Sequence, residues 1–184
     1  MGSYVFLAVR TLAVVVIAAS TWPLVSDAYD RLIAAAASSF APGEVALSAA
    51  SGRIYLSFDG AGDAGRLSIE GIVLHFGLIL MTALVVSTPG LSPYRVAGWL
   101  PAVFGILFGL HVAGLALLAR GLDTAYGGGR DGSVVGQVMS GFAIFWGLLP
   151  AVLGGLWCYR YWLPGLRELS IRHIATVDNT PTIT

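Results

Sequence analysis

Two histidines lie inside long apolar stretches of the sequence, and they carry the most distinctive chemistry found there. His75 lies in the stretch GIVLHFGLILMTALVVS, and His111 lies in the next apolar stretch. A neutral imidazole can be the axial ligand of a haem iron or of the magnesium of a bacteriochlorophyll. Each ring can equally hydrogen-bond to a neighbouring helix, to interfacial water or to a partner protein. The residue types leave cofactor ligation and structural hydrogen bonding both open.

The other reactive side chains do not form a catalytic set. Cys158 is the only cysteine, which excludes an internal disulfide and a multi-cysteine metal site. We expect it at the opposite end of the apolar stretches from the two histidines. These stretches contain no carboxylate, and Glu70 at the edge of one is expected to be solvated rather than paired with His75. We therefore expect no enzyme activity, no catalytic residues and no metal site.

The composition is that of a membrane protein. Hydrophobic residues make up 57% of the 184 residues and charged residues only 11%, whereas an average soluble domain has about 25% charged residues. The mean hydropathy is +0.81. So much apolar surface cannot enter a single core, and part of it must face lipid. The formal net charge of zero gives no reason to expect nucleic-acid binding.

Four apolar stretches are long enough to be membrane-spanning helices, because about 20 residues at about 1.5 Å each cross a hydrocarbon core of about 30 Å. They cover about residues 4–25, 71–87, 96–119 and 138–159. The sequence thus predicts an all-α membrane fold of one domain with four transmembrane helices. A glycine-rich loop over 121–137 is expected between the last two, and a disordered tail over about 174–184.

The polar segment 26–70 predicts a small cap between the first two spans. Its first part has apolar residues at helical spacing, which predicts a short amphipathic helix on the membrane surface. Alternating apolar residues in 45–49 and 54–58, separated by a turn at 50–53, then predict a β-hairpin. Leu67 and Ile69 can add a third short strand. We expect this segment to be extracytoplasmic.

The distribution of arginine sets the expected orientation. Five of the ten arginines would lie on each side of the membrane, but one set is confined to short loops and helix ends. The positive-inside rule is strongest at such positions. We therefore expect a multi-pass protein of the bacterial inner membrane with both termini in the cytoplasm.

Two series of small residues at intervals of four are candidate helix-packing surfaces, because small side chains let helix backbones approach closely in a membrane. They are Gly105, Gly109 and Ala113 in the third span, and Gly147, Ala151 and Gly155 in the fourth. His111 lies on the opposite face of the third span. Packing inside the bundle is the ordinary expectation for such series. If the histidine face points inwards instead, the glycine face is free to meet another protein.

The order of these parts resembles that of the small membrane proteins that accompany exosortases, the bacterial protein-sorting transpeptidases. The matching piece is GIVLHFGLILMTALVVSTPG, residues 71–90, which ends in a Thr-Pro-Gly turn. The transpeptidases themselves use a cysteine, an arginine and a histidine near the outer face, and Cys158 is expected at the inner end. The resemblance therefore implies an accessory role without catalysis.

Three functions remain as expectations. The first is a non-catalytic accessory or assembly subunit, with larger integral membrane protein subunits and the lipid bilayer as its partners. The alternative is a subunit of a photosynthetic or respiratory complex that binds haem or bacteriochlorophyll through His75 or His111. A small transporter is a weaker third, since the spans lack carboxylates and no inverted repeat is evident.

Overall fold

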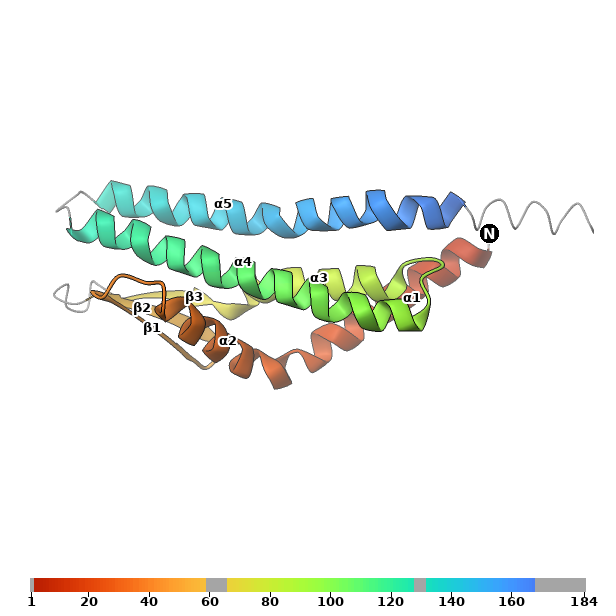
Figure 1. The fold of residues 1–184 in the computed structure, drawn as a ribbon, viewed down its shortest axis with the longest axis horizontal. Coiled ribbons are helices and arrows are strands. Elements are labelled where there is room, and N and C mark those ends of the chain that lie inside the picture. The colour runs from red at the N-terminus through yellow and green to blue at the C-terminus, as the bar shows by residue number, and fades with distance from the viewer. Residues whose placement is uncertain (1, 59–65, 128–131, 168–184) are drawn as a thin grey trace, which may run out of the picture.

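A computed structural model of the chain describes residues 2–58, 66–127 and 132–167, so the predicted disordered tail lies outside the described residues. The fold is an elongated helical bundle with a small sheet at one end (Figure 1). Its elements in chain order are α1 (Gly2–Thr21), α2 (Pro23–Ser38), β1 (Val45–Ala50), β2 (Arg53–Phe58), β3 (Arg66–Glu70), α3 (Gly71–Ser87), α4 (Pro93–Gly127), α5 (Gly132–Trp157) and the π-helical turn η2 (Cys158–Trp162).

The mostly helical membrane character is confirmed. Two helical segments, Pro93–Tyr126 and Ser133–Arg167, are long and apolar enough to cross a membrane. The pair Leu7–Thr21 and Pro23–Ser38 is a third candidate if the two helices, bent by 67°, count as one span. The apolar helix Leu74–Ser87 is shorter than a usual crossing. By length and composition the described residues thus include two or three candidate membrane-spanning helices, and the expected four crossings stay a prediction.

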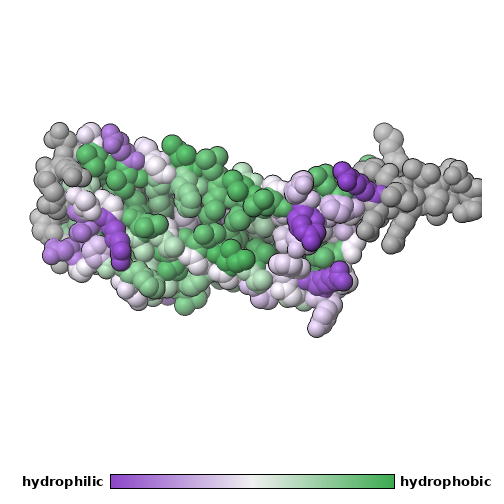
Figure 2. Space-filling model, turned by 45° about the horizontal axis from the view of Figure 1, so that its top comes forward, coloured by the Kyte–Doolittle hydropathy of each residue, from purple (hydrophilic) through white to green (hydrophobic). Residues whose placement is uncertain are grey.

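The surface has an apolar belt between two polar ends. Figure 2 shows hydrophobic residues over the middle of the molecule and hydrophilic residues gathered towards both ends. Large apolar side chains of α1, α4 and α5 are exposed, among them Val9, Ile17, Ile106, Leu148 and Val152. Contiguous exposed apolar surface of this extent is unfavourable in water. It fits a protein surrounded by lipid.

Helix α3 is the centre of the bundle. It packs against α1, α4 and α5. None of residues 77–87 is exposed, whereas Ile72 and Phe76 in its first two turns are 59% and 60% exposed. A helix that is apolar on every side is one that is surrounded on every side. The apolar composition of the 17-residue helix α3 is therefore explained by its burial inside the bundle. This explanation does not require α3 to cross the full width of a membrane.

The predicted hairpin and third strand are confirmed as a three-stranded antiparallel sheet in the order β1-β2-β3. Both residues of the β1–β2 turn have positive φ, 53° at Ser51 and 71° at Gly52. This left-handed pair is the two-residue turn that suits the twist of a hairpin. The buried side chains of β2, at Ile54, Leu56 and Phe58, alternate with more exposed ones. Helix α2 covers the sheet, since it contacts both β1 and β2.

The loop predicted over residues 121–137 is wrong for 121–127 and 132–137, while 128–131 lie outside the described residues. Helix α4 continues to Gly127, and α5 already begins at Gly132. The cap supplies a packing partner that the sequence did not reveal. Leu122 and Ala125 are almost fully buried, and the ring of Tyr126 lies 4.8 Å from that of Phe58 between centroids. These contacts stabilise one to two further helical turns despite the nearby glycines.

The segment after the first span also differs from expectation. The chain bends at Trp22, and α2 begins directly at Pro23, where a proline is favourable because its nitrogen needs no helical partner. The helix is confirmed, but it does not simply lie on a surface. Its buried residues are Asp30, Ile33, Ala34 and Ala37, and it packs on α4 and the sheet.

The contact between α4 and α5 makes a testable prediction. A Cβ at Gly114 would overlap the six-membered ring of Trp146 on α5. We expect Gly114→Ala to destabilise the fold by about 1–3 kcal/mol, the usual cost of overpacking, as measured by unfolding in mixed micelles. A Cβ at Gly109 on the same helix meets nothing within 4 Å, so Gly109→Ala is the matched control. Equal stability of the two variants would contradict this helix packing.

Candidate functional site

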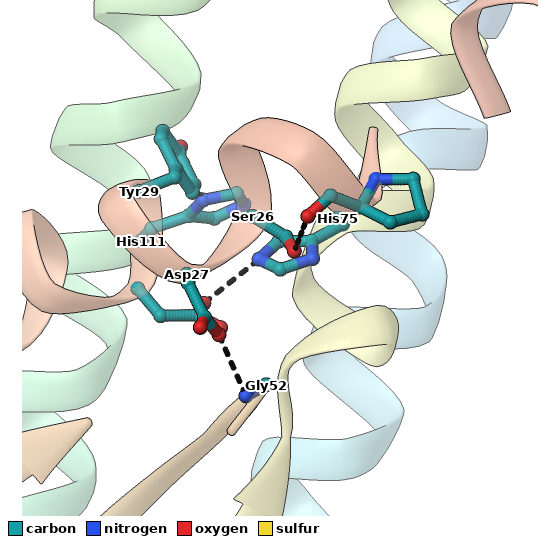
Figure 3. A network of polar contacts seen from close by, with 8 residues as sticks. Ser26, Asp27, Tyr29, Gly52, His75 and His111 are labelled. Atoms are coloured by element: carbon teal, nitrogen blue, oxygen red, sulfur yellow. Dashed lines mark hydrogen bonds and ion pairs between the residues drawn. The ribbon is translucent and has the colours of Figure 1, made fainter. Parts of the chain in front are cut away.

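Four polar side chains from three helices meet where the cap joins the bundle. We call Tyr29, Asp30, His75 and His111 the histidine cluster. Tyr29 and Asp30 come from α2, His75 from the second turn of α3, and His111 from the middle of α4. Figure 3 shows the two imidazoles close to α2, with Asp27 and Gly52 of the β1–β2 turn below them. Asp30, His75 and His111 are each at most 2% exposed.

Asp30 and His75 form a buried hydrogen bond. The Nε2 atom of His75 lies 2.8 Å from Oδ1 of Asp30, and a neutral or a charged imidazole can donate a hydrogen there. The other carboxylate oxygen, Oδ2, is buried without a hydrogen-bond partner among the described residues. It lies against the backbone of Gly71, where a Cβ would come within 2.6 Å of it. A glycine at the start of α3 is what lets the carboxylate approach.

Tyr29 and His111 form the second hydrogen bond of the cluster. The Tyr29 hydroxyl lies 2.8 Å from Nδ1 of His111. The Tyr29 ring also meets both imidazoles edge-on, with centroids 5.7 Å from His75 and 5.8 Å from His111. One tyrosine therefore lies between the two histidines and links α3 with α4.

The turn of the sheet fixes the position of this cluster. The amide of Gly52 donates to Oδ1 of Asp27 at 2.9 Å, and the carbonyl of Gly52 accepts from the amide of Gly71 at 2.8 Å. The β1–β2 turn is thus hydrogen-bonded both to α2 and to the start of α3. These bonds hold the two helices at the separation that the Asp30–His75 contact requires.

The geometry does not fit a haem or a chlorin. The hydrogen bond that each histidine makes through one ring nitrogen would leave the other free to ligate, so the obstacle is the packing around the rings. Aromatic rings cover both, because Trp22 lies 5.1 Å from His75 and Trp146 lies 5.1 Å from His111 between centroids. A macrocycle would have to displace these rings. Within the described ranges, no group of three histidine, cysteine, aspartate or glutamate side chains is placed to hold a metal ion.

The chemistry open to the cluster is hydrogen bonding and proton exchange inside the protein. Its members are packed among apolar and aromatic side chains, so a substrate has no direct access in this conformation. Removing one partner of a buried ionisable pair typically costs about 3–5 kcal/mol. The cluster is therefore well suited to hold the cap on the bundle.

The structure brings together the two predicted histidines and adds residues that the sequence reasoning missed. The apolar stretches themselves contain no carboxylate, but Asp30 of α2, outside those stretches, reaches His75. Glu70 is exposed as expected and lies 3.4 Å from Arg53. The sequence feature that could have indicated Asp30 is its spacing from Asp27. Residues three apart in a helix lie on neighbouring turns of one face, so the two carboxylates share a face of α2. Nothing in the sequence shows that this face turns inwards.

Both series of small residues face away from the bundle. The residues Gly105, Gly109, Ala113, Gly147, Ala151 and Gly155 are all exposed. A Cβ at any of the four glycines would meet nothing within 4 Å. Packing inside the chain, the ordinary expectation for these series, is therefore wrong. The glycines that make close contacts between helices are others, such as Gly77 against Pro150 and Gly154 against Leu84.

A second polar cluster lies at the other end of α3, at the Thr-Pro-Gly turn. The indole of Trp157 donates to the hydroxyl of Thr88 at 2.9 Å, and the indole of Trp162 donates to the carbonyl of Leu84 at 3.1 Å. Arg10 of α1 donates to the carbonyl of Val86 at 2.6 Å. These donors satisfy carbonyl and hydroxyl groups at the end of α3, where helical partners run out.

The comparisons with known proteins give no relative for this arrangement. Neither the models of known protein families, nor the curated proteins, nor the solved structures include a match to the chain.

The bond between Tyr29 and His111 makes a testable prediction. Tyr29→Phe removes the hydroxyl and leaves Nδ1 of His111 without its partner. We expect a loss of about 1–3 kcal/mol in unfolding free energy, the cost of leaving a buried polar group unsatisfied. Tyr55→Phe on the sheet is the matched control and should change stability little. If both variants unfold alike, the Tyr29–His111 bond does not stabilise the fold.

Proposed function

We propose that the chain is a non-catalytic accessory or assembly subunit of a larger membrane protein complex. The observation that carries this proposal is the outward position of both small-residue series, which we call the α4 stripe (Gly105, Gly109 and Ala113) and the α5 stripe (Gly147, Ala151 and Gly155). The fold does not use either stripe for its own packing.

Small residues on the surface of a membrane helix favour association with a second helix. Between helices in a membrane there is little hydrophobic driving force, so close backbone approach and van der Waals contact decide affinity. Glycine at an exposed position of a helix costs about 1 kcal/mol relative to alanine. The glycines of the two stripes lower the stability of their helices and make no packing contact with the described part of the chain. A helix of another subunit that packs on the stripes would explain why glycine occurs at these positions.

A groove along the α4 stripe supports the same proposal. It has a volume of about 440 Å³ and is lined by Gly109 and Ala113, with Phe40 of the cap at one wall. Arg120 also lines the groove and donates to the carbonyl of Phe40 at 3.2 Å. The floor of small residues would let a partner helix lie deep between α4 and the end of α2.

The proposed arrangement has four crossings, by α1, α3, α4 and α5, in a bacterial inner membrane. Both termini are cytoplasmic, and the sheet with α2 is extracytoplasmic. Of the exposed arginines, Arg95, Arg160 and Arg167 belong to helix ends away from the sheet, and Arg10 from the middle of α1 donates to the last turn of α3 on the same side, in agreement with the positive-inside rule. The resemblance of residues 71–90 to exosortase-associated proteins agrees with an accessory role.

Cross-linking in the membrane tests the accessory role. In a Cys158→Ser background, Gly109→Cys should cross-link to a larger membrane protein of the native host. The reason is that Gly109 belongs to the α4 stripe, the surface on which the partner helix is proposed to pack. Ala13 is an exposed small residue on α1, and Ala13→Cys is the matched control that should stay uncross-linked. A band at twice the mass of the chain would show self-association and contradict the accessory role.

Cysteine labelling tests the four crossings. With Cys158 replaced by serine, Ser48→Cys on β1 and Thr124→Cys near the end of α4 should react with a membrane-impermeant maleimide from outside. Ser92→Cys in the α3–α4 turn should react only after permeabilisation. Labelling of Ser48→Cys and Thr124→Cys from opposite sides would contradict the arrangement.

A further inference from the structure

A second groove differs from the one on the α4 stripe in its lining and its location. It lies between α4 and α5 near their cytoplasmic ends in the proposed orientation, and its volume is about 280 Å³. Its walls include Trp99, Ile106, Leu153 and Leu156, and Arg160 is the one charged residue in its lining. Ile106 and Leu156 are 56% and 61% exposed. The groove therefore opens onto the apolar belt.

Its lining argues against a partner helix as the occupant. None of the residues that line it is glycine, alanine or serine. A helix backbone cannot approach closely where every wall side chain is large. The aromatic rings are also already packed on each other, with Trp157 lying 4.4 Å from Tyr161 and 5.5 Å from Trp99 between centroids. A thin, flexible hydrocarbon chain suits such a groove better than a helix does.

The charges around the polar end of the groove favour an anionic headgroup. The described helix ends on this side carry Arg95, Arg160 and Arg167. Arg10 from the middle of α1 also reaches this side, where it donates to the carbonyl of Val86 near the end of α3. None of the carboxylates among the described residues belongs to these ends, since all lie in or beside α2, the sheet or the last turns of α4. Clusters of basic residues at the cytoplasmic ends of membrane helices attract anionic lipids.

We propose that this groove binds an anionic phospholipid, with one acyl chain between α4 and α5 and the phosphate beside Arg160. The aromatic side chains Trp99, Trp157 and Tyr161 then lie at the level where amphipathic rings prefer the membrane interface. The guanidinium of Arg160 also lies 5.3 Å from the centre of the Tyr161 ring. This proposal needs only a chain inserted in a membrane and does not depend on the accessory role.

Tryptophan fluorescence tests the proposal, because Trp99 and Trp157 line the groove. The full chain is placed in nanodiscs of unbrominated phosphatidylcholine containing a small fraction of lipid with brominated acyl chains, which quench indoles on contact. We expect brominated phosphatidylglycerol to quench about fivefold more efficiently than brominated phosphatidylcholine. This ratio is the increase in affinity that one arginine beside an anionic headgroup typically provides. Equal quenching by the two lipids would overturn the proposal and indicate contact with bulk lipid alone.

Single substitutions test whether the preferential quenching by phosphatidylglycerol arises in this groove. Arg160→Gln should remove the preference for phosphatidylglycerol, whereas Arg167→Gln, an exposed arginine outside the groove lining, should keep it. Trp99→Phe should reduce the preferential quenching, and Trp22→Phe, at the α1–α2 bend, should leave it unchanged. A preference that survives Arg160→Gln, or that Trp22→Phe reduces and Trp99→Phe does not, would overturn the assignment. Circular dichroism verifies that each variant is folded.

Discussion

The structure depends on one hydrogen bond between two ionisable side chains, Asp30 and His75, in a largely apolar protein. Both are almost completely buried, and their atoms lie 2.8 Å apart. An ionisable group without a partner is costly in such surroundings, so each side chain requires the other. Asp30 belongs to α2, which carries the sheet, and His75 belongs to α3 at the centre of the bundle. The bond therefore joins the cap and the bundle into one body.

Helix α3 is held by polar contacts at both ends and by apolar packing between them. Near its start, Asp30 and the turn at Gly52 fix its position. At its end, the indoles of Trp157 and Trp162 and the guanidinium of Arg10 donate to the last turn. Because α1, α4 and α5 all pack on this helix, fixing α3 fixes the bundle. The outward stripes of α4 and α5 are not needed for that purpose, which is the reason for proposing that a partner helix packs on them.

Local patterns in the sequence were enough for the helices and the sheet. Alternating apolar residues and a Ser51-Gly52 turn predict the hairpin because strand period and turn conformation are local properties. The length of α4 was missed because the packing of Tyr126 on Phe58 depends on segments far apart in sequence. The same holds for Asp30, which lies on a helix face whose direction only the folded chain determines. His75 and His111 were identified as candidates, but their tyrosine and aspartate partners were not.

A double-mutant cycle measures whether Asp30 and His75 stabilise the fold through each other. The unfolding free energies of Asp30→Ala, His75→Ala and the double variant are compared with that of the unchanged chain in mixed micelles. The account predicts that each single replacement costs about 3–5 kcal/mol and that the double replacement costs clearly less than the sum, since the second removes a group already left unpaired. Strictly additive losses would contradict the account, because they would mean that the two side chains do not stabilise the fold through each other.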